Sequence, residues 1–290
     1  MSSTPVVHSF HHAASGTWTH VVADPASAQA AIVDPVLDFD AASGSIGTRP
    51  AAALLARIGE LGLDVAAILE THAHADHLSA GAWIRDRCSA PLAIGAGIVQ
   101  VQRTFKQSLD IGDEFVADGT QFDRLLHDGD TLRIGTLELR VIATPGHTPD
   151  SVAYHVGDAL FTGDTLFAPG AGTARCDFPG GSAAMLYRSI RRLYELPDST
   201  RVFLCHDYPA SGADAVAQTR IGDEKQANTQ LRADTPEADY TAARERRDAT
   251  LPVPKLLWPA IQFNIRGGRL PADGVNGRAF FKLPVAFDAE

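Results

Sequence analysis

The chain has 290 residues, a length that predicts one large domain or two small ones. Hydrophobic residues make up 45% and charged residues 21%, a globular balance that excludes a chain disordered throughout. The formal net charge of −10 disfavours a nucleic-acid partner, because binding to phosphates depends on Lys and Arg. No apolar run approaches the roughly 20 residues that cross a bilayer, so we expect no membrane association.

The cysteines and the N-terminal residues indicate a reducing compartment. Cys88, Cys176 and Cys205 are odd in number and widely spaced, which argues against a disulfide framework. The first Lys or Arg is Arg49, so the positive start of a secretory signal or transit peptide is not seen. We therefore expect a cytoplasmic protein.

Hydrophobic periodicity predicts alternating strands and helices. In chain order the patterns predict two strands at the edge of a sheet, Trp18–Ala23 and Ala30–Val36, and then a helix over Pro50–Leu63. A buried strand at Asp64–Glu70, a second helix over Ala80–Arg87 and another strand at Leu92–Ile94 follow. Residues 131–164 are typical of successive strands, and a helix over Ser182–Leu196 precedes a strand at Arg201–Cys205. This alternation predicts a layered α/β fold.

The C-terminal part of the chain has a different composition. Residues 218–249 are charged and helical in pattern, and we expect residues 220–248 to present a solvated helix face. Residues 251–290 contain five prolines, too many for a continuous helix. We predict a catalytic domain over residues 1–211 and a C-terminal helical and Pro-rich extension over 212–290 packed on it.

The segment THAHADH is the strongest functional pattern. It places His72, His74, Asp76 and His77 within six residues, directly after the predicted strand Asp64–Glu70. Without a cation between them, three imidazoles and a carboxylate so close would repel one another or leave hydrogen bonds unmade. The segment therefore predicts a metal site.

Three further candidate ligands each follow a predicted strand. His147 lies in TPGHT, Asp164 in FTGDT and His206 in CHDY. Neutral imidazole with carboxylate is the ligand set of zinc and of non-haem Fe(II). The set fits two zinc ions bridged by Asp164, and it fits equally a single iron held by three of the ligands.

In this order, the motifs resemble the metallo-β-lactamase superfamily over about residues 5–210. The resemblance implies an αββα sandwich with its metal site at one edge of two facing sheets. It assigns the ligand positions to His72, His74, Asp76, His77, His147, Asp164 and His206.

Within that superfamily, the chain resembles the persulfide dioxygenases, and most closely their bacterial β-lactamase-like hydrolase branch. The resemblance rests on ALFTGDTLFAPGAGTARCDF at 159–178, on CHDY at 205–208 and on LPVPKLLWPAIQFNIRGG at 251–268. It implies one Fe(II) per chain, held by His72, His147 and Asp164. The implied substrates are glutathione persulfide and O2, and the products are sulfite and glutathione.

The same resemblance implies roles for the remaining candidates. His74, Asp76, His77 and His206 would orient the iron ligands and bound water, or form a vestigial second metal site. Arg175 matches a family arginine near the glutathione site and would bind substrate; its alternative is a surface ion pair with Asp177. Apart from the resemblance, Tyr208 is a candidate to hydrogen-bond substrate or a metal ligand; its alternative is a half-buried aromatic with a hydrated hydroxyl. We expect Cys176 and Cys205 to be packing residues. Val253–Gly268 lies either near the mouth of the site or on the surface as a plain brace, and both interpretations stay open on the sequence.

Several alternatives stay open on the sequence. The main one is a glyoxalase-II-like hydrolase of glutathione thioesters with two zinc ions per chain. A lactonase or β-lactamase would leave the resemblance around the glutathione site unexplained, and a persulfide carrier would bind without turnover. The dioxygenase could act alone or with a separate sulfurtransferase, as a monomer or as a homo-oligomer.

Overall fold

Two mixed β-sheets packed face to face form the centre of the molecule. The structure, a computed structural model, describes residues 4–209, 213–272, 274 and 276–285. The first sheet has the order β1 (Val6–His12), β2 (Thr17–Ala23), β3 (Gln29–Val33), β6 (Asp64–Leu69), β8 (Leu92–Gly95) and β9 (Arg124–Leu126). The second has β10 (Thr131–Ile134), β11 (Leu137–Ala143), β12 (Val152–Val156), β13 (Ala159–Phe161), β14 (Arg201–Phe203) and β15 (Gln218–Arg220), in that order.

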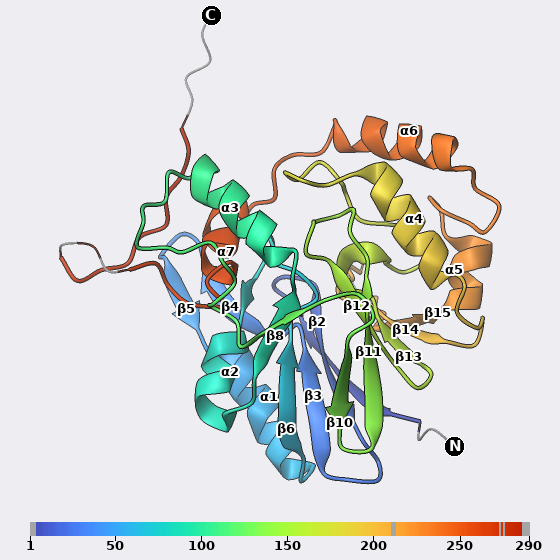
Figure 1. The fold of residues 1–290 in the computed structure, drawn as a ribbon, viewed down its shortest axis with the longest axis horizontal. Helices are drawn as coiled ribbons and strands as arrows, with labels where there is room; N and C mark the ends of the chain where they lie inside the picture. The colour runs from blue at the N-terminus through green and yellow to red at the C-terminus, as the bar shows by residue number, and fades with distance from the viewer. Residues whose placement is uncertain (1–3, 210–212, 273, 275, 286–290) are drawn as a thin grey trace, which may run out of the picture.

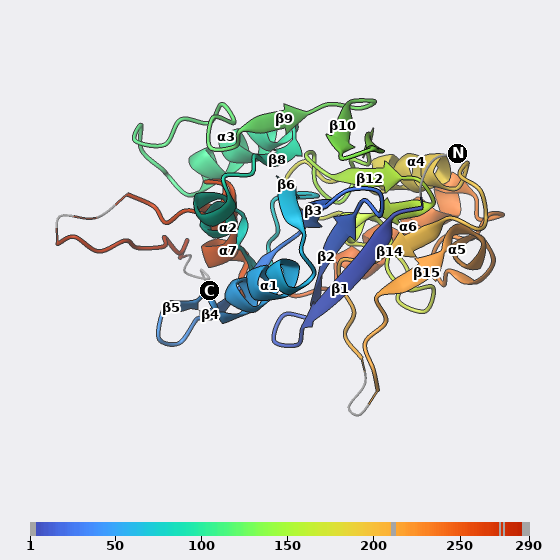
Figure 2. The same cartoon turned by 90° about the horizontal axis from the view of Figure 1, so that it is seen from below.

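Helices cover the outer face of each sheet (Figure 1). On the first sheet lie α1 (Arg49–Glu60), α2 (Gly81–Cys88), α3 (Ile98–Ser108) and α7 (Leu257–Asn264); on the second lie α4 (Ala183–Leu193), α5 (Ile221–Ala227) and α6 (Glu237–Asp248). A small sheet of β5 (Ser45–Gly47), β4 (Val36–Asp40) and β7 (Leu78–Ser79) flanks the first layer. Figure 2 shows the layers from below, and the predicted αββα sandwich is confirmed.

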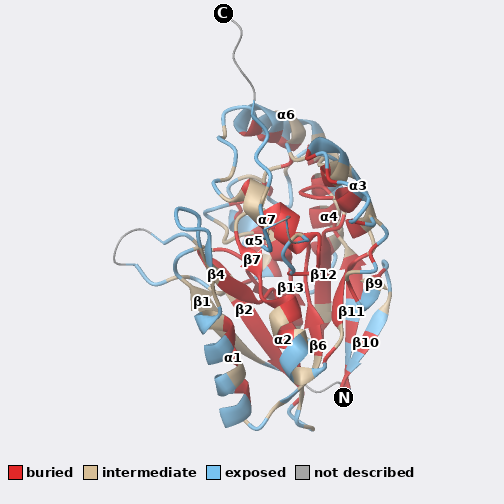
Figure 3. Cartoon of the chain, turned by 90° about the vertical axis from the view of Figure 1, so that its left-hand side faces the viewer, coloured by how far each residue is buried: buried red, intermediate tan, exposed pale blue. Residues whose placement is uncertain are grey.

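Alternating residues of the strands build three apolar layers. In β2, Val21 packs towards the helices of the first sheet and Val22 towards the second sheet. In β11, Val141 faces the first sheet, whereas Ile142 packs under α4. Because successive side chains of a strand point to opposite faces, strands covered on both sides are apolar throughout. Figure 3 shows the resulting band of buried strands.

The edge position predicted for the first two strands is wrong. β2 and β3 lie inside the first sheet, and β1 forms its edge by pairing antiparallel with β2. The predicted strand Ala30–Val36 is also two strands, β3 and β4, because Asp34 interrupts it with a φ of 50° in the left-handed region. The interruption turns the Asp34 side chain towards the end of β6, where it binds Thr71.

The C-terminal part of the chain contacts both halves of the sandwich. β15 pairs with β14, α6 packs on α4, and α7 lies against β7. The predicted boundary at 211/212 falls in residues 210–212, outside the described residues. Among the described residues, no helix combines the length and apolarity needed to span a bilayer.

The prediction of a solvated helix face over residues 220–248 is wrong for several side chains. Arg244 and Asp248 are buried as an ion pair within α6, and Glu224 of α5 is fully buried. These side chains are buried because of tertiary packing. The extension packs against α4 and the loop Gly172–Thr173, where Arg244 donates to the Thr173 carbonyl oxygen.

Candidate metal centre

The predicted ligands converge because each follows the carboxyl end of a strand. His72 and His74 follow β6, and His147 follows β11. Asp164 lies in a single 3₁₀ turn (Gly163–Thr165) after β13, and His206 follows β14. These strand ends lie at one edge of the sandwich, so residues up to 134 positions apart in the sequence meet in space.

His72, His147 and Asp164 form a first cluster. The Nε2 atoms of His72 and His147 lie 3.8 and 3.6 Å from Asp164 Oδ2. The possible ligand atoms of all three residues lie within 4.8 Å of one another. One carboxylate oxygen therefore faces two imidazole nitrogens across a gap of the size that a metal ion fills.

A second cluster contains His74, Asp76, His77 and His206. His206 Nε2 lies 3.3 Å from Asp76 Oδ2 and 3.3 Å from Asp164 Oδ1. Asp164 thus turns one oxygen towards each cluster. The structure brings all seven predicted ligands together.

Hydrogen bonds fix which nitrogen carries the proton in three of the imidazoles. His147 Nδ1 donates to the carbonyl oxygen of Arg175 at 2.7 Å, which leaves the Nε2 lone pair free. His74 donates in the opposite sense, from Nε2 to Asp34 Oδ1 at 3.0 Å, which leaves Nδ1 free. The Thr71 hydroxyl donates to Asp34, so it accepts from His72 Nδ1 and leaves Nε2 of His72 free.

The free lone pairs have no partner in the protein. Among the described residues, the buried side-chain atoms without a hydrogen bond include five in the two clusters: His72 Nε2, His74 Nδ1, His77 Nε2, Asp164 Oδ1 and His206 Nε2. Leaving so many polar atoms unpaired away from water costs several kcal/mol, roughly 1–3 kcal/mol for each. A bound cation removes that cost, so this donor set fits a metal ion.

Burial also holds two of the imidazoles, those of His72 and His74, in their ligating form. Burial, together with the neighbouring imidazoles, lowers the pKa of His72 and of His74 well below the usual value. Burial opposes ionisation of Asp76, but His206 and the other histidines outweigh it and hold that carboxyl pKa well below normal. Neutral imidazoles beside ionised carboxylates are the forms that coordinate metals.

Several residues that the sequence did not single out support the clusters. Asp34, at the end of β3, accepts hydrogen bonds from the Thr71 amide and hydroxyl as well as from His74. Asp150 accepts from the Ala73 amide at 2.8 Å. The Thr17 hydroxyl lies 3.3 Å from His77 Nδ1 and 3.4 Å from His206 Nδ1. Each acts through a contact remote in sequence, so no local pattern marked it.

A pocket of about 540 Å³ opens above the clusters. Asp76, His147, Asp164 and His206 are among its lining residues. Phe167 and Phe178 add apolar surface, and the segment 252–255 of the extension adds another wall. Its size is within the range of small-molecule sites.

Both predicted substrate residues line this pocket, and both already have protein contacts. Arg175 donates from Nε and Nη2 to the two carboxylate oxygens of Asp177, at 2.6 Å each, and from Nη1 to the Pro252 carbonyl oxygen at 2.8 Å. Tyr208 is 68% exposed, stacks on His206 and donates to Asp76 at 3.4 Å. Arg247 and Lys255, both exposed, supply further positive charge around the pocket.

Comparison with known proteins agrees with this geometry. The model of the metallo-beta-lactamase superfamily matches residues 15–206. The chain belongs to this superfamily. It is 44% identical over 289 residues to a probable metallo-hydrolase of Burkholderia pseudomallei, a match that covers 96% of this chain and 98% of the relative.

Other relatives place the chain near the persulfide dioxygenases. The mitochondrial persulfide dioxygenase ETHE1 of Homo sapiens is 33% identical over 71% of this chain and 70% of its own length. The crystal structure of ETHE1 from Myxococcus xanthus superposes with a TM-score of 0.73 at 31% identity, covering 91% of this chain and 100% of that one.

A hydroxyacylglutathione hydrolase of Rhodopseudomonas palustris is 31% identical over 67% of this chain and 80% of its own length.

Some of the curated relatives are longer than this chain. A beta-lactamase hydrolase-like protein of Xylella fastidiosa is 45% identical over 282 residues, which cover 97% of this chain but 65% of the relative.

The cysteines near the pocket give a testable consequence of burial. Burial raises the pKa of Cys176 to about 12, and burial with nearby Asp34 raises that of Cys205. Cys88, at the end of α2, is half-buried. Because the thiolate is the reactive form, we expect Cys88 to be alkylated first in the native protein at pH 8, with Cys176 and Cys205 reacting only on unfolding. Mass spectrometry of iodoacetamide-treated protein measures this order, and early modification of Cys176 would contradict it.

Proposed function

We propose that the protein is a persulfide dioxygenase that converts glutathione persulfide, O2 and water to sulfite and glutathione. The observation that carries this proposal is the cluster of His72, His147 and Asp164 at the base of a pocket. The similarity of the chain to persulfide dioxygenase ETHE1 in sequence, and to an ETHE1 structure in fold, gives further support. We propose one Fe(II) per chain, held by these three residues.

Two imidazoles and one carboxylate suit this reaction because they are a ligand set of non-haem Fe(II) oxygenases and would leave positions on the iron open to O2 and substrate. Bound there, Fe(II) would supply the site at which O2 and the outer sulfur of the persulfide meet. In the overall reaction that sulfur loses four electrons to O2. Sulfite takes two oxygen atoms from O2 and one from water, and two protons are released.

The second cluster supports the first in this proposal. His206 Nε2 lies 3.3 Å from Asp76 Oδ2 and 3.3 Å from Asp164 Oδ1, so a protonated imidazole there would attract the Asp164 oxygen that points away from the first cluster. The Arg175 carbonyl oxygen accepts a hydrogen bond from His147 Nδ1, which orients the Nε2 atom of that ring towards the proposed iron position. Such partners restrict the ligands to one orientation and tune their basicity.

Substrate recognition is proposed for the pocket wall beside the clusters. We propose that Arg175 binds a carboxylate of the glutathionyl group with the N–H groups that its contacts to Asp177 and Pro252 leave free. Tyr208, which also lines the pocket, would offer its hydroxyl. Arg247 and Lys255 add positive charge that suits the two carboxylates of glutathione.

A glyoxalase-II-like hydrolase of glutathione thioesters is the second candidate. It is favoured by the completeness of the second cluster, in which His74, His77 and His206 each have an unpartnered buried nitrogen. Asp164 faces both clusters, as a residue bridging two zinc ions would. The similarity to a hydroxyacylglutathione hydrolase adds weight to this alternative.

Metal content and turnover on one sample separate the two candidates. For protein purified without oxygen, we expect close to one iron per chain and O2 uptake when glutathione persulfide is added. Elemental analysis and an oxygen electrode make the measurements. Two tightly bound zinc ions, with full activity on a glutathione thioester and no O2 uptake, would overturn the proposal in favour of the hydrolase.

Substitutions distinguish direct ligands from supporting residues. His147→Ala or Asp164→Asn should remove iron and O2 uptake together, because each deletes a metal bond. His206→Ala and Asp76→Asn should keep most of the iron and lower activity by about 10–100-fold, the usual cost of a supporting contact. If His206→Ala empties the site as fully as His147→Ala does, the assignment of a single iron is wrong.

Arg175→Lys tests the proposed carboxylate contact. Lysine keeps the charge but loses the planar fork, so kcat/KM for glutathione persulfide should fall by about ten- to 150-fold with iron content unchanged. The loss should nearly vanish for a small persulfide that lacks carboxylates. Unchanged kinetics in both Arg175→Lys and Arg175→Ala would show that this arginine only pairs with Asp177 and braces Pro252.

A further inference from the structure

One side chain of the C-terminal extension holds the segment that carries four of the candidate ligands. We call Thr71–His77 the histidine loop. The side-chain amide of Asn264, at the end of α7, donates to the carbonyl oxygens of His74 and His77, both at 2.8 Å. Its Oδ1 accepts from the Ser79 amide at 2.9 Å. Both donors of the amide and its acceptor are therefore used on one short stretch of chain.

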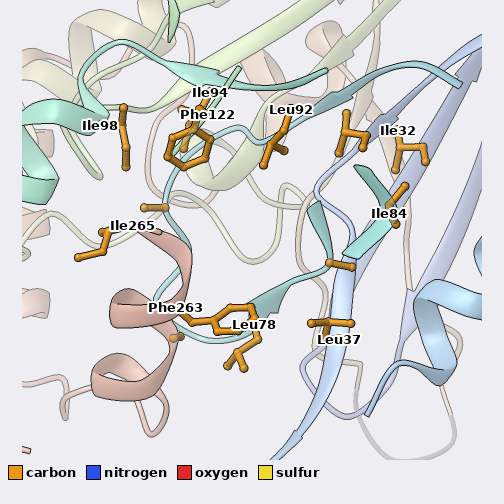
Figure 4. Close-up of a cluster of buried hydrophobic side chains, with 14 of the residues drawn as sticks. Ile32, Leu37, Leu78, Ile84, Leu92, Ile94, Ile98, Phe122, Phe263 and Ile265 are labelled. Carbon is orange, nitrogen blue, oxygen red and sulfur yellow. The ribbon is translucent and has the colours of Figure 1, made fainter. Parts of the chain in front are cut away.

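The position of Asn264 is fixed by its surroundings. Its neighbours Phe263 and Ile265 belong to the apolar core that also contains Leu78, next to the histidine loop (Figure 4). The Gln102 side chain donates to the Ile265 carbonyl oxygen at 2.8 Å, which ties the end of α7 to α3. Asn264 itself is 4% exposed.

The backbone after Asn264 also depends on close packing. Gly267 and Gly268 both have positive φ, 64° and 81°. A Cβ atom on Gly267 would lie 2.7 Å from the Gln121 carbonyl oxygen, and one on Gly268 would lie 3.1 Å from the Ser79 carbonyl oxygen. The two glycines allow the chain to turn away directly after α7 while α7 stays pressed against β7.

We propose that Asn264 is a positioning residue for the metal centre, through which the C-terminal extension sets the geometry of the second cluster. His74 and His77 both belong to that cluster, and Asn264 holds their backbone carbonyls at a fixed separation. Asn264 forms no hydrogen bond with His72, His147 or Asp164. Its effect should therefore centre on His74, Asp76 and His77, and reach the first cluster through His72, which belongs to the same loop, and through Asp164. The inference rests on the proposed function only where turnover is measured.

α7 offers a matched control in Gln262. This side chain is also a carboxamide, is 1% exposed and makes three hydrogen bonds, but to Trp258 and Lys282 instead of the histidine loop. Asn264→Ala and Gln262→Ala thus remove the same chemistry from the same helix. A purely structural role for Asn264 predicts the same outcome for both variants.

The experiment compares the two variants as purified full chains loaded with Co(II), whose visible absorption reports ligand geometry. We expect similar falls in Tm for both, since each loses three buried hydrogen bonds. Only Asn264→Ala should change the Co(II) spectrum and weaken metal binding by about 10–100-fold. In the iron-loaded protein, kcat should fall with KM within about twofold, because Arg175, the proposed carboxylate-binding residue, lies outside the histidine loop. Spectra and affinities that match between the two variants would overturn the inference.

Two provisions keep the comparison decisive. If Asn264→Ala does not fold, Asn264→Asp replaces it: the shape and the acceptor for Ser79 are kept, but both donors to the histidine loop are lost. The same spectral change is then expected, and an unchanged spectrum overturns the inference. If the unmodified protein shows no O2 uptake, the proposed dioxygenase function fails, while the Co(II) spectra still decide the role of Asn264.

Discussion

The buried carboxylate of Asp34 is the contact on which the metal centre depends. It accepts hydrogen bonds from the Thr71 amide, the Thr71 hydroxyl and His74 Nε2. The Thr71 hydroxyl, with its proton committed to Asp34, then accepts from His72 Nδ1. One anion therefore sets the proton positions of two imidazoles and directs different nitrogens of His72 and His74 into the site. A neutral amide in its place would reverse part of this pattern, since it brings N–H donors of its own.

The histidine loop is held from three sides by elements far apart in the sequence. Asp34 binds it from the end of β3, Asp150 from the loop after β11, and Asn264 from α7. These contacts satisfy the backbone of a segment with no regular structure, a requirement for any irregular segment buried in protein. What they leave unsatisfied is the inward row of nitrogen lone pairs. A preorganised metal site requires both features: a loop held rigidly by its surroundings, and ligand atoms that are not already used in hydrogen bonds.

The residues of the two clusters could be picked out in the sequence as candidate ligands because their pattern is local. THAHADH concentrates its chemistry in seven residues, and His147, Asp164 and His206 each follow an apolar strand at a turn. The supporting residues carry no such mark. Asp34 before a proline is typical of a turn, and its contact with Thr71 depends on β3 and β6 being neighbours in the sheet. Asn264 lies in an apolar run 190 residues from His74, so only the folded chain brings them together.

The difference between local patterns and contacts remote in sequence also explains the errors in the predicted fold. Apolar alternation predicted strands at β2 and β3 but not their place in the sheet, because the polar β1 that covers the edge carries a weaker pattern. Charge over residues 220–248 predicted solvent exposure, whereas Arg244 and Asp248 neutralise each other under the loop at Thr173. Strand order and pairing of buried charges are properties of tertiary packing, and composition does not contain them.

The contact between Asn264 and the histidine loop has a consequence for synthesis of the protein. At roughly 5–20 residues per second, the ribosome needs on the order of ten to forty seconds to add the 190 residues that separate His74 from Asn264. During that interval the four candidate ligands of the loop already exist, but Asn264, which we propose fixes their spacing, does not. A metal ion captured then would meet flexible ligands, which discriminate poorly between metals. If Asn264 fixes the loop as proposed, discrimination between metals by ligand geometry begins only once α7 has been made and packed against β7.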